Sequence, residues 1–124
     1  MIQNKIALAA CSGMSPNGLI SRVAADDIVK ESDNIISICM GATSADREGF
    51  RGLIKKYPII AINGCDGECV NKILTQKGVK PKTTINVMEL LKEENIAAND
   101  VSRLDENGEK CVLAVKRKVK QVME

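Results

Sequence analysis

"KIALAACSGMSPNGLISRVAADDIVKES", residues 5–32, joins a short apolar run to a helix-forming segment through a turn of small residues. Residues 5–10 are apolar at nearly every position, which is typical of a strand buried on both faces. After the turn, Ser15 is a candidate N-cap and Pro16 suits the first helical position, ahead of apolar residues at helical spacing. The stretch therefore predicts a strand followed directly by a helix, the basic unit of an α/β protein.

The same order of strand and helix repeats along the chain. We predict further strands at 34–39, 59–62 and 83–88, and further helices from residue 43 or 44 to 56, from 68 to 77, from 89 to 96 and from 109 to 123. The last of these helices is amphipathic, and parallel strands need the crossovers that the others supply. We therefore expect residues 1–124 to form one small three-layer α/β domain, Rossmann-like or flavodoxin-like. Its four-stranded parallel sheet has the order 2-1-3-4, with helices on both faces.

The composition limits the classes of partner. The chain has 124 residues, 44% of them hydrophobic and 27% charged, with a net charge of +2 and only one Phe, one Tyr and no Trp. So few aromatic residues and so small a net charge argue against a nucleic-acid partner. No apolar stretch approaches the roughly 20 residues of a membrane-spanning helix, and none resembles a signal peptide. We expect a cytoplasmic protein without a membrane partner, which could form a homodimer through its amphipathic terminal helix.

The chain has no histidine and five cysteines. The lack of histidine excludes Ser/His and Cys/His nucleophile pairs and mixed Cys/His zinc sites. Cysteines of cytoplasmic proteins stay reduced, and they are more often metal ligands or catalytic groups than disulfides. The candidate chemistry therefore lies with the thiols.

Four of the cysteines follow the predicted strands in a regular way. Cys11, Cys39 and Cys65 come at the carboxyl ends of the first three strands, and Cys69 follows Cys65 by four residues. Carboxyl ends of parallel strands meet at one edge of a sheet, where adjacent strands are about 4.8 Å apart. We expect these four thiols to converge there, and Cys111, on the last helix, to lie away from them.

Such a cluster has more than one chemical interpretation. Four thiolates are the ligand set of a structural zinc site, and an iron–sulfur cluster takes the same set. Alternatively, Cys11 is the nucleophile of a thiol redox or sulfur-transfer enzyme, with Cys65 or Cys69 as the resolving thiol. Each cysteine taken singly could also be a small hydrophobic residue of the core. The residues themselves leave open whether the protein is an enzyme.

Three segments resemble a known family: "AACSG" at 9–13, "SICMGA" at 37–42 and above all "PIIAINGCDGECVNKILTQKGV" at 58–79. They are similar to the DGC-domain family of small zinc-binding proteins, named for an Asp-Gly-Cys motif. The resemblance implies zinc held by Cys11, Cys39, Cys65 and Cys69, and it implies no particular reaction. One departure is Asn63, which stands where the motif has Asp and therefore removes a negative charge.

Overall fold

The computed structural model describes residues 5–11, 13–64, 67–100 and 103–123. The strands are β1 (Ile6–Ala10), β2 (Ile35–Ile38), β3 (Ile59–Asn63) and β4 (Thr83–Asn86). The helices are α1 (Pro16–Glu31), α2 (Met40–Ser44), α3 (Glu48–Lys56), α4 (Cys69–Gln76), α5 (Val87–Glu93) and α6 (Glu106–Met123).

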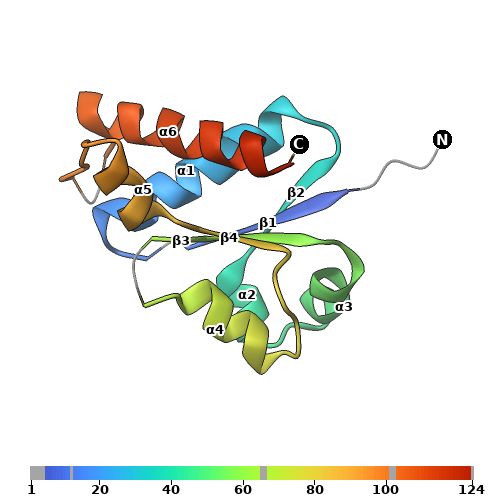
Figure 1. The fold of residues 1–124 in the computed structure, drawn as a ribbon. Helices are drawn as coiled ribbons and strands as arrows, with labels where there is room; N and C mark the ends of the chain where they lie inside the picture. Colours follow the sequence, from blue (N-terminus) through green and yellow to red (C-terminus); the bar gives the residue numbers. More distant parts are fainter. Residues whose placement is uncertain (1–4, 12, 65–66, 101–102, 124) are drawn as a thin grey trace.

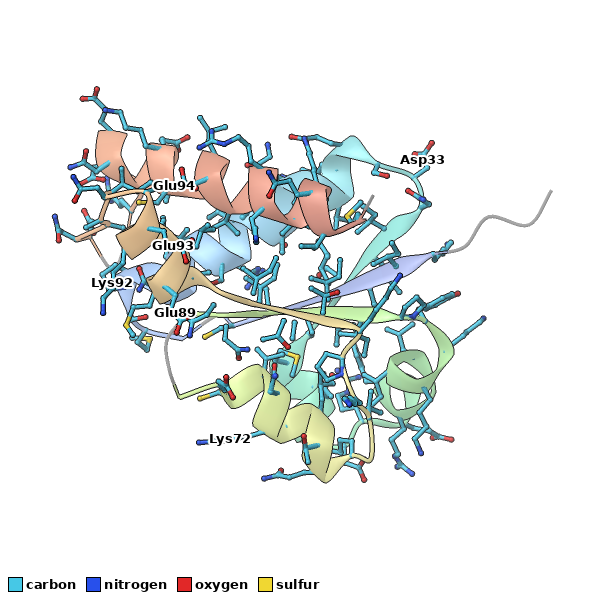
Figure 2. All side chains as sticks on the ribbon, in the orientation of Figure 1. Asp33, Lys72, Glu89, Lys92, Glu93 and Glu94 are labelled. Atoms are coloured by element: carbon cyan, nitrogen blue, oxygen red, sulfur yellow. The ribbon has the colours of Figure 1, made fainter. Side chains whose placement is uncertain are left out.

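The strands form one parallel sheet in the order β2-β1-β3-β4, as predicted. Helices α1, α5 and α6 cover one face of the sheet, and α2, α3 and α4 cover the other (Figure 1). Charged side chains such as Asp33 and Lys72 point outward from these layers (Figure 2). The three-layer α/β architecture is therefore confirmed.

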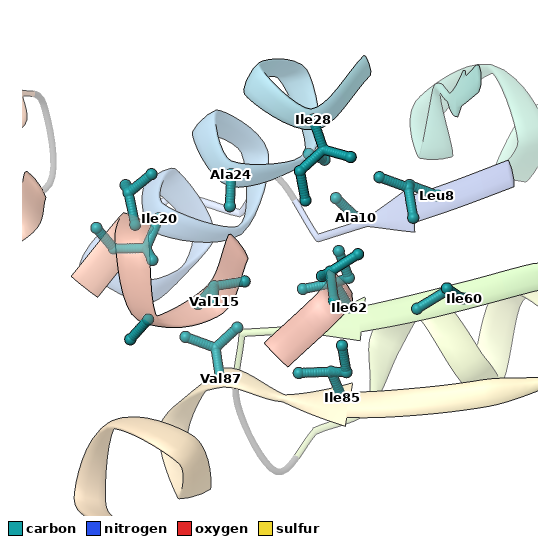
Figure 3. Packing of buried hydrophobic residues seen from close by; sticks show 14 of the residues in the cluster. Leu8, Ala10, Ile20, Ala24, Ile28, Ile60, Ile62, Ile85, Val87 and Val115 are labelled. Carbon is teal, nitrogen blue, oxygen red and sulfur yellow. The ribbon is translucent and has the colours of Figure 1, made fainter. Parts of the chain in front are cut away.

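The core is aliphatic and is divided in two by the sheet. Alternate residues of β1 point to opposite faces, so that Leu8 packs with α1 and α6 while Ala7 packs with α3 and α4. Figure 3 shows the first of these clusters, in which Ile62 of β3 lies near Val115 of α6. Because helices cover both faces, β1 and β3 are buried almost along their whole length, which explains their unbroken apolar sequence.

The prediction of one continuous helix from residue 43 or 44 to 56 is wrong. The structure has two helices here, α2 and α3, separated by a turn in which Asp46 has a φ of 61°. A left-handed residue cannot continue a right-handed α-helix, and Asp tolerates that conformation better than most residues. The sequence "TSAD" is therefore the end of one helix and the turn after it.

Two other helices begin earlier than predicted, because side-chain caps precede them. The Oδ1 atom of Asn86 accepts a hydrogen bond from the amide of Glu89 at 3.1 Å, which ends β4 and starts α5. The Oδ1 atom of Asp105 accepts from the amide of Gly108 at 2.7 Å, at the beginning of α6. In both places a short polar side chain decides the boundary.

The apolar face of α6 packs inside the domain. Val112, Val115 and Val119 are buried against the side of the sheet that α1 also covers. The structure therefore gives no support to a homodimer formed through this face, which stays a prediction. In the described part of the chain no helix has the length and apolar character needed to cross a membrane.

Candidate metal centre

Two of the predicted ligands follow adjacent strands at the carboxyl-terminal edge of the sheet. Cys11 follows β1, and its amide donates a hydrogen bond to the carbonyl oxygen of Ile62 in β3 at 2.8 Å. Cys39 follows β2, whose last residue pairs with Ala9 of β1. Cys11 is half-buried and Cys39 is exposed. The parallel register thus brings the two thiols to one edge of the molecule.

The thiol of Cys39 is the N-cap of α2. Its Sγ accepts a hydrogen bond from the amide of Ala42 at 3.5 Å. The carbonyl oxygen of the same residue accepts from the Thr43 hydroxyl at 2.8 Å. Cysteine is not a usual capping residue, so the residue pattern did not indicate this role.

The turn that carries Cys11 packs closely on the end of β3. The predicted capping by Ser15 is confirmed, since its Oγ accepts from the amide of Gly18 at 3.1 Å. A Cβ atom on Gly18 would lie 2.3 Å from the carbonyl oxygen of Gly13, and one on Gly64 would lie 3.3 Å from the amide of Gly18. These glycines therefore allow backbone to approach backbone. The close approach joins the turn after β1 to the end of β3.

Asn63 connects the end of β3 to the start of α4. It is 1% exposed, its Oδ1 accepts from the amide of Val70 at 3.1 Å, and its Nδ2 donates to Oδ1 of Asn71 at 2.9 Å. The Nδ2 of Asn71 in turn reaches the Thr84 hydroxyl of β4 at 3.1 Å. This network fixes the first turn of α4 against two strands. Asn71 and Thr84 were not among the predicted site residues, because their relation to Asn63 depends on the tertiary fold.

Cys69 is the first residue of α4 and is exposed. Glu68, the residue just before it, has a φ of 51°, so the backbone takes a left-handed conformation where the chain enters α4. Cys65 and Asp66 lie outside the described residues. Among the residues that are described, no three His, Cys, Asp or Glu side chains form a group able to hold a metal ion. The predicted four-thiolate site includes Cys65 and so stays a prediction.

A small cavity of about 110 Å³ lies beside Cys39, between α1 and the end of β2. Arg22 and Asp26 of α1 line it and form an ion pair with a 3.0 Å separation between Nε and Oδ2. This pair was not among the predicted site residues, since charged residues four apart are common on exposed helix faces. The cavity puts a cation and a carboxylate next to one predicted ligand.

Cys111 lies in a different environment from the other described cysteines. It is 0% exposed in α6 and belongs to the core cluster on the α1 side of the sheet, whereas Cys11 packs against the cluster on the other side. Burial raises the pKa of the Cys111 thiol, and the carboxylates of Asp105 and Glu94 raise it further. A buried thiol of this kind is a packing residue, separate from the candidate site.

Comparison with known proteins identifies the family. No curated protein and no solved structure matches the chain. The family model described as the DGC domain matches residues 7–115, which include β2, β3 and β4, all of β1 except Ile6, and the first part of α6. This match agrees with the resemblance of the three cysteine-bearing segments, and the chain belongs to the DGC domain family.

Proposed function

We propose that the protein binds one zinc ion at the carboxyl-terminal edge of its sheet through the thiolates of Cys11, Cys39, Cys65 and Cys69. The observation that carries the proposal is the exposure of the described cysteines. Cysteine is among the most deeply buried residue types, yet Cys39 and Cys69 are exposed and Cys11 is only half-buried. Poorly buried thiols after two adjacent strands and at the start of α4 need a chemical explanation, and metal ligation supplies one.

The donor set fits the metal. Zinc prefers four tetrahedral ligands and binds cysteine thiolates at about 2.3 Å, and four protein ligands are typical of a structural rather than a catalytic site. A four-thiolate site carries excess negative charge, which amide donors stabilise. The hydrogen bond from the Ala42 amide to Cys39 Sγ, at 3.5 Å, is a donor of this kind. The proposed role is therefore metal binding that stabilises the edge of the sheet, without an assigned reaction.

Substitution of single cysteines tests the ligand set. We expect the wild-type protein to bind about one zinc per chain. Cys39→Ser and Cys69→Ser should each weaken zinc binding by at least about 10-fold to 100-fold. Substitution of a residue that only hydrogen-bonds to a zinc ligand already weakens binding by that much. Cys111→Ala is the matched control, because Cys111 is buried in the other core cluster. Metal content is measured by mass spectrometry, and affinity by competition with a chelating dye.

The same experiment separates the alternatives. An iron–sulfur cluster takes four thiolates and would give iron and sulfide together with visible absorption after anaerobic purification. Thiol redox or sulfur-transfer chemistry at Cys11 would give protein without metal and with freely alkylated thiols. Equal zinc affinity in Cys39→Ser, Cys69→Ser and the wild type would contradict the proposed site.

A further inference from the structure

A second concave region lies at the opposite, amino-terminal edge of the sheet. It has a volume of about 420 Å³ and lies between the end of α3 and the segment 77–82, which joins α4 to β4 (Figure 1). The volume falls in the range of about 300–1,000 Å³ that is typical of small-molecule pockets. We refer to it as the α3 hollow, and the residues that line it are Ile54, Lys55, Tyr57, Pro58, Ile59, Gly78, Val79, Lys80 and Lys82.

The α3 hollow is strongly basic. Lys55, Lys80 and Lys82 line it and are exposed, and no carboxylate lines it. Within the described chain, none of these three lysines has an ion-pair partner. A neighbouring hollow adds Arg51 and Lys77, which share the carboxylate of Asp46 at 3.3 and 3.6 Å. Positive charge therefore gathers here without matching negative charge.

Several exposed carboxylates lie on the other side of the molecule, among basic residues of α6 such as Arg117. Glu89, Glu93 and Glu94 of α5 and the turn after it lie on the face of the sheet opposite α3 (Figure 2). The small net charge of +2 thus conceals a local excess of positive charge at the α3 hollow. A local positive field of this kind attracts anions, whatever the net charge of the chain.

The floor of the α3 hollow is apolar and includes the one tyrosine of the chain. Ile54, Pro58 and Val79 line it together with Tyr57. The Nζ atom of Lys56 lies 5.3 Å from the centre of the Tyr57 ring, a cation–π contact that adds a further positive charge beside this lining residue. A ligand that fits both parts of the hollow has an anionic group for the lysines and a flat apolar group for the floor.

We propose that the α3 hollow binds a small organic polyphosphate of the nucleoside diphosphate class. Lysines bind phosphate as point charges and do not require the fork geometry of arginine. The three lysines of the hollow suit a doubly or triply charged group better than a single carboxylate. The small extent of the basic lining, three lysines beside a few apolar residues, favours a small molecule over an acidic protein segment, which would need a larger surface. This inference does not depend on the metal centre, which lies at the other edge of the sheet.

Titration of the full-length protein with ADP tests the proposal. Amide signals of a ¹⁵N-labelled sample are followed by NMR without added divalent cations. ADP should shift the signals of Gly78 and Lys80 saturably, and the binding should weaken as salt is added. Tripolyphosphate should bind more weakly than ADP, because it lacks the group that contacts the apolar floor. Adenosine, which lacks the phosphates, should not bind measurably.

Charge-matched variants make the result specific. Lys80→Gln with Lys82→Gln should weaken ADP binding about tenfold or more, the effect expected for loss of charge-assisted contacts. Lys30→Gln with Lys110→Gln removes the same charge from exposed lysines elsewhere and should change the affinity less than about twofold. If both pairs of substitutions weakened ADP binding equally, the binding would reflect the general positive charge of the protein, and the proposed site would be overturned. Absence of saturable shifts, equal binding of tripolyphosphate and ADP, or tighter binding of a glutamate-rich peptide would also overturn it.

Discussion

Asn63 is the position at which this chain departs from the Asp-Gly-Cys pattern of its family. Both ends of its buried amide are used, one by the Val70 amide and the other by Asn71. An aspartate could make equivalent bonds if the amide of Asn71 turned over, because the Thr84 hydroxyl can donate as well as accept. The network therefore accommodates either residue and preserves the connection between β3 and α4.

Substitution of Asn63 tests this network. Asn63→Ala leaves the buried Val70 amide without its acceptor and should lower the free energy of unfolding by about 1–3 kcal/mol. Asn63→Asp keeps an acceptor and should lower it by less. Both values come from urea unfolding followed by circular dichroism. A stability of Asn63→Ala equal to that of the wild type, or a larger loss for Asn63→Asp than for Asn63→Ala, would show that the network is not organised in this way.

Gly18 provides a second test at the level of single residues. A Cβ atom there would lie 2.3 Å from the Gly13 carbonyl oxygen, so Gly18→Ala must displace backbone and should destabilise the protein by about 1–3 kcal/mol or more. A Cβ atom on Gly52, inside α3, would point into open space, so Gly52→Ala should instead stabilise by about 0.5–1 kcal/mol. Thermal unfolding of the two variants distinguishes these effects. Similar behaviour of both would mean that the turn after β1 does not pack as described.

At the scale of elements, α6 is joined to α1 by apolar packing and by ion pairs at the surface. The carboxylate of Glu31 in α1 accepts hydrogen bonds from the Nζ atoms of Lys116 and Lys120 in α6, the second at 3.1 Å. The Oδ2 atom of Asp27 lies 3.7 Å from the Nζ atom of Lys116. The hydrogen bond from Lys116 is the largest cause that lowers the pKa of the Glu31 carboxyl, and the bond from Lys120 follows. The hydrogen bond to Glu31 in turn raises the pKa of Lys116.

These shifts set the pH range in which the ion pairs stabilise the protein. The folded-state pKa of Glu31 lies below its usual value of 4.5, so its contribution is present above that pH and is lost as the pH falls further. The folded-state pKa of Lys116 lies above 10.5, so its contribution is present below that pH and is lost as the pH rises further. Both contributions are therefore present at neutral pH.

Glu31→Gln should consequently reduce stability at neutral pH by a small amount and reduce the loss of stability on acidification below pH 4.5. The effect is small because the carboxylate is exposed and salt screens it. Urea midpoints across the acid range measure it, with Glu93→Gln, an exposed carboxylate on α5, as the control. An acid-range slope identical to that of the wild type would show that these ion pairs do not stabilise the folded state.

At the scale of the whole molecule, the sheet was predictable because its strands are short apolar runs separated by helical segments. Parallel strands joined by crossovers can be arranged in only a few strand orders, and the observed order β2-β1-β3-β4 was the one expected. The arrangement of α2 and α3 was not predictable, because the start of α2 depends on a thiol as helix cap and the break before α3 depends on the left-handed conformation of Asp46. Local capping of this kind competes with the overall pattern and is weakly marked in the sequence.

The strand ends that carry Cys11 and Cys39 were predictable, but the side-chain surroundings of the candidate site were not. Cys11 and Cys39 were placed correctly at adjacent strand ends, since only the strand boundaries and their order were needed. The cavity beside Cys39 and the network around Asn63 required side-chain positions that no spacing rule supplies. Of the other two predicted ligands, Cys69 is the first residue of α4 and Cys65 lies outside the described residues, so the ligand set stays a prediction.

The most direct test of the metal centre is the metal content of protein purified anaerobically without an affinity metal, together with a count of the thiols that alkylate in the native state. We expect about one zinc per chain, with Cys11, Cys39, Cys65 and Cys69 protected until a chelator removes the metal. Cys111 should stay unreactive with or without the chelator, because it is buried in the core. Protein without bound metal, whose Cys39 and Cys69 alkylate at once, would contradict the proposed metal centre.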